Sequence, residues 1–207
     1  QRQMCIRDRT IEVGTNPNDK TTITATNGAT AIYSKGNGST VTSNAGDKLT
    51  INVNAGTTKE GLAVYAEDGT EVTLQNANIN VVGATAGVAS YGPGNTKVDL
   101  TGATLKYDGE GYAVYSDGQG KIDLTNSKIE LRGSSTLMEL DLSIPVANRP
   151  ITTAGTEVKV FSNDVVAINV SNLGTKNITD LTTLNTSLGV KTVSYTHLRA
   201  HETPEHL

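Results

Sequence analysis

Apolar and polar residues alternate in short runs along most of the chain, and these runs recur at a nearly constant spacing. Three similar segments begin at Gly61, Gly87 and Gly111 and read GLAVYAEDGTEVTLQNANINVVG, GVASYGPGNTKVDLTGATLKYDG and GYAVYSDGQGKIDLTNSKIELRG. Each has a G-x-A-x-Y run, a glycine-containing turn, an apolar-x-Leu run, a polar turn and an apolar-x-apolar run. Because alternation with a period of two is typical of half-buried strands, each unit predicts three short β-strands separated by turns.

The units share one phase in four columns. Tyr65, Tyr91 and Tyr115 are separated by 26 and 24 residues. The same steps relate three apolar columns: Val72–Val98–Ile122, Leu74–Leu100–Leu124 and Ile79–Leu105–Ile129. An earlier copy starts at Ala29 and carries Ala31, Tyr33, Val41, Ile51 and Val53. Tyr33 precedes Tyr65 by 32 residues, which predicts a longer turn within Asn54–Glu60.

A unit of this length cannot bury the apolar faces of its strands alone, and no segment of it has the long 3.6-residue period of a helix. Stacking of the units solves the problem, because each strand then pairs in parallel with the same strand of the next unit, about 4.8 Å away. The rest of each coil becomes the crossover, and crossovers are almost always right-handed. The sequence therefore predicts an all-β fold, a right-handed parallel β-helix with three strands per coil of about 24–26 residues.

The direction of the G-x-A-x-Y run has two alternatives. Either its Ala and Tyr residues face the interior, or the intervening residues do, namely Ile32, Val64, Ser90 and Val114. Outward tyrosines would form an exposed aromatic ladder able to contact sugar rings. Simple packing along the solenoid is the interpretation that we favour. In the turn after this run we expect positive φ angles at three glycines, Gly69, Gly94 and Gly118, while Pro93 fixes φ there.

Regular repeats occupy residues 10–135, and we expect residues 136–192 to continue the β-helix less regularly, with insertions. Two strand-like runs lie around Val158–Phe161 and Val165–Val170. The segment SIPVANRPI contains two prolines and predicts a loop. A weak helical spacing, in a segment rich in Thr and Asn, links Ile178, Leu181, Leu184 and Leu188.

The two ends of the chain differ from everything between them. QRQMCIRDR holds the single cysteine, Cys5, and VSYTHLRAHETPEHL holds all three histidines, His197, His201 and His206, with Glu202 and Glu205 beside them. Two histidines four residues apart are a modest zinc signal. Both ends, however, resemble the translation of a transposase mosaic-end sequencing adapter, in compatible orientations. We therefore predict that residues 1–9 and 193–207 derive from an adapter, and we exclude them from reasoning about the fold.

Composition narrows the function classes. The chain has 21 acidic and 17 basic residues, a formal net charge of −4 that is spread along the sequence. Nucleic acid is not an expected partner, because phosphate binding requires clustered Lys and Arg. No stretch approaches the ~20 apolar residues of a membrane helix. Residues 10–192 contain no cysteine, which excludes a disulfide scaffold and fits many exported bacterial proteins.

The repeated G-x-A-x-Y-[SA] block, the glycine turn, the short V-x-L strands and the Thr- and Asn-rich turns resemble passenger domains of bacterial autotransporters, the type V secreted proteins. The resemblance is close over residues 10–135 and loose over 136–192. It implies an adhesin-like stalk at the bacterial cell surface, with a host or neighbouring-cell protein or glycan as partner. It also implies a longer native chain with a C-terminal outer-membrane β-barrel, which this sequence lacks.

We therefore expect a non-catalytic binding stalk without catalytic residues, cofactor or metal. The alternatives are a pectate-lyase-like enzyme acting on polysaccharides and a phage tail-fibre solenoid. An enzyme of that kind needs clustered acidic or basic side chains on adjacent coils. Asp99 and Asp123 share one column and form a candidate pair, but Thr73 occupies that column in the preceding coil. Because they alternate with inward apolar residues, we expect both carboxylates to be solvated.

Overall fold

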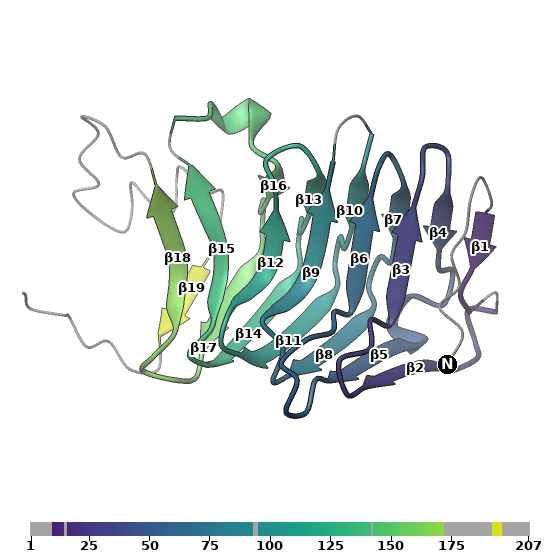
Figure 1. The fold of residues 1–207 in the computed structure, drawn as a ribbon, viewed down its shortest axis with the longest axis horizontal. Helices are drawn as coiled ribbons and strands as arrows, with labels where there is room; N and C mark the ends of the chain where they lie inside the picture. The colour runs from purple at the N-terminus through teal and green to yellow at the C-terminus, as the bar shows by residue number, and fades with distance from the viewer. Residues whose placement is uncertain (1–9, 15, 93–94, 142, 172–191, 196–207) are drawn as a thin grey trace, which may run out of the picture.

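The chain folds as a stack of short β-strands that wind into a solenoid (Figure 1). The computed structural model describes residues 10–14, 16–92, 95–141, 143–171 and 192–195. Its strands form three parallel sheets, and successive strands along the chain pass from one sheet to the next. The predicted parallel β-helix with three strands per coil is confirmed.

Each sheet takes one strand from each coil, which places residues about one repeat apart side by side. Sheet A contains β1 (Thr10–Glu12), β4 (Thr40–Thr42), β7 (Glu71–Thr73), β10 (Lys97–Asp99), β13 (Lys121–Asp123) and β16 (Ile151–Thr152). Sheet B contains β2 (Thr21–Thr26), β5 (Leu49–Asn54), β8 (Asn78–Val82), β11 (Thr104–Gly109), β14 (Lys128–Gly133), β17 (Glu157–Val160) and β19 (Thr192–Tyr195). Sheet C contains β3 (Ile32–Lys35), β6 (Val64–Glu67), β9 (Ala86–Tyr91), β12 (Tyr112–Ser116), β15 (Thr136–Asp141) and β18 (Val166–Ser171).

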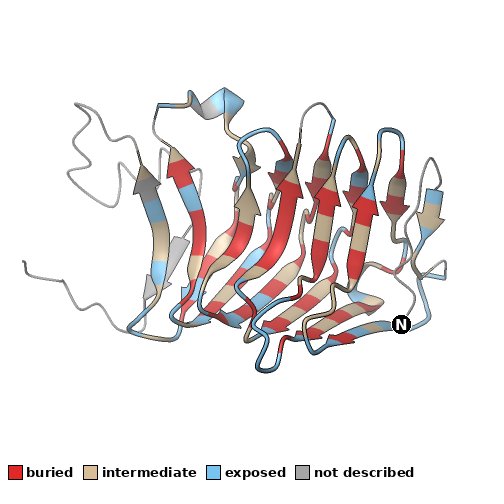
Figure 2. Cartoon of the chain, viewed as in Figure 1, coloured by how far each residue is buried: buried red, intermediate tan, exposed pale blue. Residues whose placement is uncertain are grey.

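The interior is filled by the predicted apolar columns. Val98 lies in register with Val72 on one side and Ile122 on the other, and Leu105 lies in register with Ile79 and Ile129. All of these side chains, and those of Leu74, Leu100 and Leu124, are at most 1% exposed. Burial alternates along the strands as the pattern predicts (Figure 2). Each buried side chain of this size contributes roughly 1.5–3 kcal/mol, so the columns provide most of the stability of the stack.

The turns carry the differences between coils. The long turn predicted before the second coil is confirmed, because residues 55–63 separate β5 from β6. Gly69 and Gly118 have φ angles of 88° and 93°, as expected for left-handed turn positions. Gly94 and Pro93 lie outside the described residues.

Strands β15 to β18 continue the three sheets beyond the regular repeats. The strand-like runs predicted there correspond to β17 and β18, within one residue at each end. The predicted SIPVANRPI loop connects β15 to β16 and contains a 3-10 helix, η2 (Val146–Asn148); a second, η1 (Gly46–Lys48), precedes β5. β19 pairs with β17 and includes Val193–Tyr195, so a strand crosses the boundary predicted for the C-terminal flank. The weak helical segment, Cys5 and the three histidines lie outside the described residues.

One predicted register is wrong. Tyr65 lies in register with Ala89, not with Tyr91, and Ala89 in turn lies in register with Tyr115. The two extra residues of the third coil therefore fall after β9, in the turn that leads to β10, and not before it. Tyr91 is displaced by two residues along its strand and pairs with Glu67.

Candidate functional site

A continuous row of tyrosine side chains crosses the outer face of sheet C. We call it the tyrosine stripe, and it consists of Tyr33, Tyr65, Tyr91, Tyr115 and Tyr112. Neighbouring ring centroids are 5.3, 5.3, 5.4 and 5.8 Å apart in that order. At its far end the Tyr112 hydroxyl accepts a hydrogen bond of 3.2 Å from Asn169 on β18. The stripe therefore connects the first and the last strand of sheet C.

Burial shows which side chains of the G-x-A-x-Y runs in sheet C point into the interior. The intervening residues of the G-x-A-x-Y run are all buried, namely Ile32, Val64, Ser90 and Val114, whereas the tyrosines are only partly buried. The tyrosines thus point outward. The favoured interpretation also holds in part, because the rings pack against one another along the solenoid.

Ala89 explains how the row stays continuous despite the register shift. Its side chain is 1% exposed, yet it lies outside the interior cluster of core residues. It occupies the outward position between Tyr65 and Tyr115. Because a methyl group leaves space there, the Tyr91 ring fills the gap from two residues further along, edge-on to Tyr65 at 81°.

At the end of the stripe near β3, the tyrosine hydroxyls are engaged within the protein. Tyr33 and Tyr65 both donate hydrogen bonds to the Glu67 carboxylate, the latter over 3.0 Å. Lys35 pairs with the same carboxylate at 2.9 Å and with Asp68 at 3.2 Å. Burial alone would raise the pKa of Glu67, but these hydrogen bonds and the Lys35 charge lower it. Burial and the bond to Glu67 raise the pKa of Tyr65 to about 12. This end is a closed structural network.

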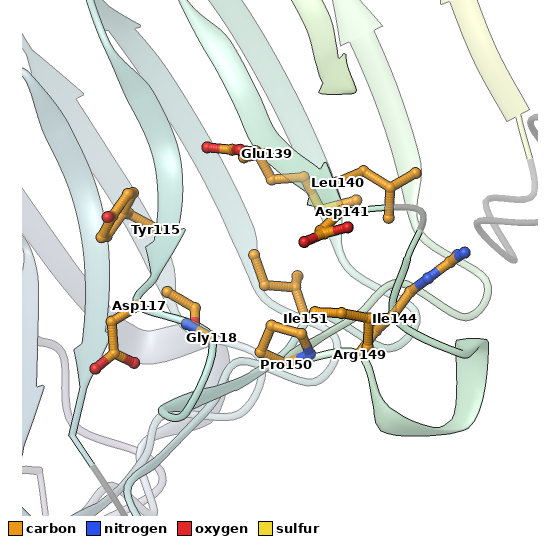
Figure 3. A pocket seen from close by; sticks show the side chains of 12 residues that line it. Tyr115, Asp117, Gly118, Glu139, Leu140, Asp141, Ile144, Arg149, Pro150 and Ile151 are labelled. Atoms are coloured by element: carbon orange, nitrogen blue, oxygen red, sulfur yellow. The ribbon is translucent and has the colours of Figure 1, made fainter. Parts of the chain in front are cut away.

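The other end of the stripe opens into a cavity of about 230 Å³. Its walls come from the end of β12 and from β15, and its floor includes Pro150 and Ile151 from the chain that enters β16 (Figure 3). Tyr115 stands on the β12 side, and Glu139 extends towards it from β15. Asp141 lies in the middle of the site, while the Arg149 side chain points away from Tyr115. A second cavity on sheet A, about 310 Å³ and lined by Lys97 and Lys121, shares Arg149 and Pro150 with it.

Glu67, Glu139 and Arg149 are not among the residues predicted from the sequence. The signal for Glu67 was its position two residues after Tyr65, on the same outward side of the strand. The signal for Glu139 was the alternation in LMELD, which places two acids outward on β15. Arg149 carried no signal, since it belongs to a loop.

The candidate acid pair behaves differently from the expectation. Asp99 and Asp123 are in register, and Thr73 precedes them in the column, as predicted. Asp99 is nevertheless buried, at 8% exposure. Its carboxylate accepts hydrogen bonds from the Thr101 backbone N–H at 3.0 Å and from Gln75 at 3.1 Å. Burial tends to raise the pKa of Asp99, but these bonds and Lys97 lower it. The expectation of a solvated side chain is wrong because each aspartate closes a D-L-T turn.

Asp123 repeats the same turn one coil later. Its carboxylate accepts from the backbone N–H of Thr125 at 3.0 Å and from the hydroxyl of Thr125 at 2.6 Å. Both acids therefore act as turn-forming Asx residues. Over the described ranges, no group of three or more His, Cys, Asp or Glu residues is placed to hold a metal ion.

None of the helices in the described part of the chain has the length and apolar character needed to cross a membrane. Comparison of the chain with protein-family models, with curated proteins and with solved structures finds no significant match.

Proposed function

We propose that this chain is the non-catalytic stalk of an exported, adhesin-like bacterial protein, and that the outer face of sheet C is its ligand-binding face. In this role the β-solenoid holds the tyrosine stripe away from the cell that displays it. The ligand belongs to a host or neighbouring cell, and its chemistry suits a glycan. The type V secretion route remains part of the proposal, supported by the repeat pattern of residues 10–135.

The observation that carries the proposal is the outward tyrosine stripe itself. Five partly exposed aromatic side chains in one line are unusual on a protein whose aromatic content is only 4%. Aromatic rings provide large, rigid contact area with a polar edge, which is why they are enriched at recognition surfaces. A sugar presents a face of C–H groups that packs on such rings, and hydroxyl groups that bond to neighbouring carboxylates.

The enzymatic alternative receives less support. The two acids that the sequence singled out for it, Asp99 and Asp123, accept hydrogen bonds from the backbone of their own turns. The phage tail-fibre alternative shares the solenoid and has no separate observation in its favour.

The test is adhesion of the whole chain. Fluorescent beads coated with the protein are applied to a glycan array that includes host and bacterial polysaccharides. The test variant carries Tyr65→Ala and Tyr91→Ala, which remove the centre of the stripe. The control variant is Ile129→Val, an interior change that also costs stability, at roughly 0.5–1.5 kcal/mol. Circular dichroism establishes that all three proteins are folded at the assay temperature.

We expect the parent and the control to bind the same glycans, and the double variant to lose at least tenfold in bead retention. Binding that is unchanged in the double variant would refute sheet C as the binding face. An array on which no glycan is bound would refute a glycan as the ligand.

A further inference from the structure

We propose that the cavity between β12 and β15 is a subsite for a single uncharged pyranose ring, the ring that anchors the glycan chain lying along the tyrosine stripe. The inference rests on the proposed function, because it assigns the ligand class at one defined point of the same face. It is carried by three features of the cavity: an interruption in the sheet, two polar groups without a hydrogen-bond partner among the described residues, and the sign of the local charge.

The cavity occupies a split in sheet C. One registered pair, Tyr112 with Thr136, joins β12 to β15 along the described length of these strands. By contrast, four registered pairs join β12 to β9 and five join β15 to β18. Beyond Tyr112 the two strands diverge, and the cavity lies between Tyr115–Gly118 and Met138–Asp141. Backbone N–H and C=O groups that would pair across an intact sheet are therefore available to a ligand with hydroxyl groups.

Two polar side chains at the cavity have no partner among the described residues. The Tyr115 hydroxyl makes no hydrogen bond there, and the Glu139 carboxylate makes neither a hydrogen bond nor an ion pair. At the opposite end of the stripe, Glu67 satisfies the hydroxyls of both Tyr33 and Tyr65. Tyrosine and glutamate are thus hydrogen-bonded to each other at the β3 end of the stripe, whereas Tyr115 and Glu139 at the cavity are not. A hydroxyl donor from β12 and a carboxylate acceptor from β15 thus line the same cavity, and together they match the hydroxyl rim of a sugar.

The walls supply the complementary apolar surface. The Tyr115 ring is held by contacts with Tyr91 and Tyr112, at 5.4 and 5.8 Å, which fix its orientation before a ligand arrives. Met138, Leu140 and Ile151 contribute apolar atoms to the lining. The volume of about 230 Å³ is below the ~300–1,000 Å³ of pockets for drug-sized ligands, so it accommodates one ring and not an oligosaccharide.

Charge selects the class of sugar. Glu139 and Asp141 line the cavity, and Asp117 lies at its edge. The one cation in the lining, Arg149, points away from Tyr115. Uronic and sialic acids would bring a further negative charge to these carboxylates, which costs binding free energy. The site therefore favours a neutral hexopyranose and disfavours acidic sugars.

The experiment is a titration of the whole, isotope-labelled chain, followed by NMR chemical shifts. The probes are the methyl glycosides of glucose, galactose, mannose and N-acetylglucosamine, with methyl glucuronide as the acidic probe. The test variant is Glu139→Gln, which keeps the size of the side chain and removes its charge. The matched control is Glu71→Gln, the same change at an exposed carboxylate on β7 of sheet A.

We expect at least one neutral glycoside to bind with a millimolar dissociation constant and to shift the signals of Tyr115 and of β15. Glu139→Gln is expected to weaken this binding at least fivefold, whereas Glu71→Gln leaves it unchanged. Methyl glucuronide is expected to bind at least tenfold more weakly than the best neutral probe.

The subsite is refuted if no probe shifts Tyr115, if Glu139→Gln binds as tightly as the parent, or if the glucuronide binds best. The proposed function fails separately. Shifts confined to Tyr33, Tyr65 and Tyr91 would refute the subsite and retain the binding face, whereas bead binding that is unchanged in the Tyr65→Ala and Tyr91→Ala double variant would refute the binding face.

Discussion

Tyr91 packs edge-on against Tyr65 at 5.3 Å, although the residue in register with Tyr65 is Ala89. The strand has a side-chain period of two, so the displacement of Tyr91 by two residues keeps its ring on the outer face. A displacement by one residue would have turned the ring into the interior. The even-numbered offset therefore preserves the stripe despite the two extra residues in this coil.

This contact predicts energetic coupling within the stripe. A double-mutant cycle of Tyr65→Ala and Tyr91→Ala should give a coupling free energy of about 0.5–1.5 kcal/mol, the usual range for an aromatic pair. Urea unfolding monitored by circular dichroism measures it. The control cycle combines Tyr33→Ala with Tyr115→Ala, whose rings are not neighbours in the stripe, and should give a value near zero. Equal coupling in the two cycles would contradict pairwise ring packing.

The interior columns predict a much larger effect for a buried charge. Val98 is fully buried between Val72 and Ile122, so Val98→Asp places a carboxylate where it has no partner. We expect a loss of several kcal/mol and unfolding of the adjacent coils.

Thermal unfolding measures this loss, and Lys121→Thr on the neighbouring strand serves as the control. Lys121 is exposed, so its substitution should change the free energy of unfolding by no more than about 0.5 kcal/mol. An unchanged melting temperature for Val98→Asp would mean that the column does not face inward.

The sequence was sufficient for the fold because the repeat fixed both the strands and their order. Val72, Val98 and Ile122 could be aligned without ambiguity, since an apolar residue at that place is required in every coil. The tyrosine column lacked this constraint. Matching Tyr91 to Tyr65 placed the two extra residues before β9, whereas the structure places them in the turn after it. Turns tolerate insertions that strands do not, and identity of side chains on an outer face does not fix register.

The candidate site was less accessible to prediction for a different reason. Alternation predicts two faces for each strand but does not say which face is inside when one carries Ala and Tyr and the other carries Ile, Val or Ser. The cavity depends on the divergence of β12 from β15 and on the course of the loop through Arg149. Neither follows from periodicity, because both arise where the repeat ends.

The Glu67 network predicts a dependence of stability on pH. Its hydrogen bonds lower the folded-state pKa of Glu67 below the usual ~4.3 of the unfolded chain. The contribution of Glu67 is thus fully present above about pH 5 and is lost as the pH falls through the folded-state value. Glu67→Gln should cost about 1–3 kcal/mol at pH 7, since the carboxylate is 17% exposed and accepts three hydrogen bonds.

Urea unfolding at pH 7, 5, 4 and 3 separates Glu67 from other groups. Asp99 and Asp117 also have lowered pKa values. Their protonation at low pH therefore reduces the free energy of unfolding of the parent and of every variant alike. The difference between the parent and Glu67→Gln should narrow from pH 5 to pH 3. Glu71→Gln, on sheet A, should run parallel to the parent throughout. A difference between parent and Glu67→Gln that stays constant with pH would show that the network does not depend on the Glu67 charge.

Gly111, which begins one of the repeats, predicts a steric effect that is distinct from turn conformation. A Cβ added at Gly111 would overlap the carbonyl oxygen of Thr85 on the preceding coil, and Gly111 does not have a positive φ. Gly118 has the opposite character, with φ of 93° and open space around its Cβ position. Gly118→Ala should therefore cost only about 1 kcal/mol, through backbone strain. Gly111→Ala should cost about 1–3 kcal/mol or more, because the coils must separate at the corner between sheets B and C. Chemical unfolding of the two variants compares their free energies of unfolding directly. A larger loss for Gly118→Ala would show that turn strain costs more stability than the close approach of neighbouring coils.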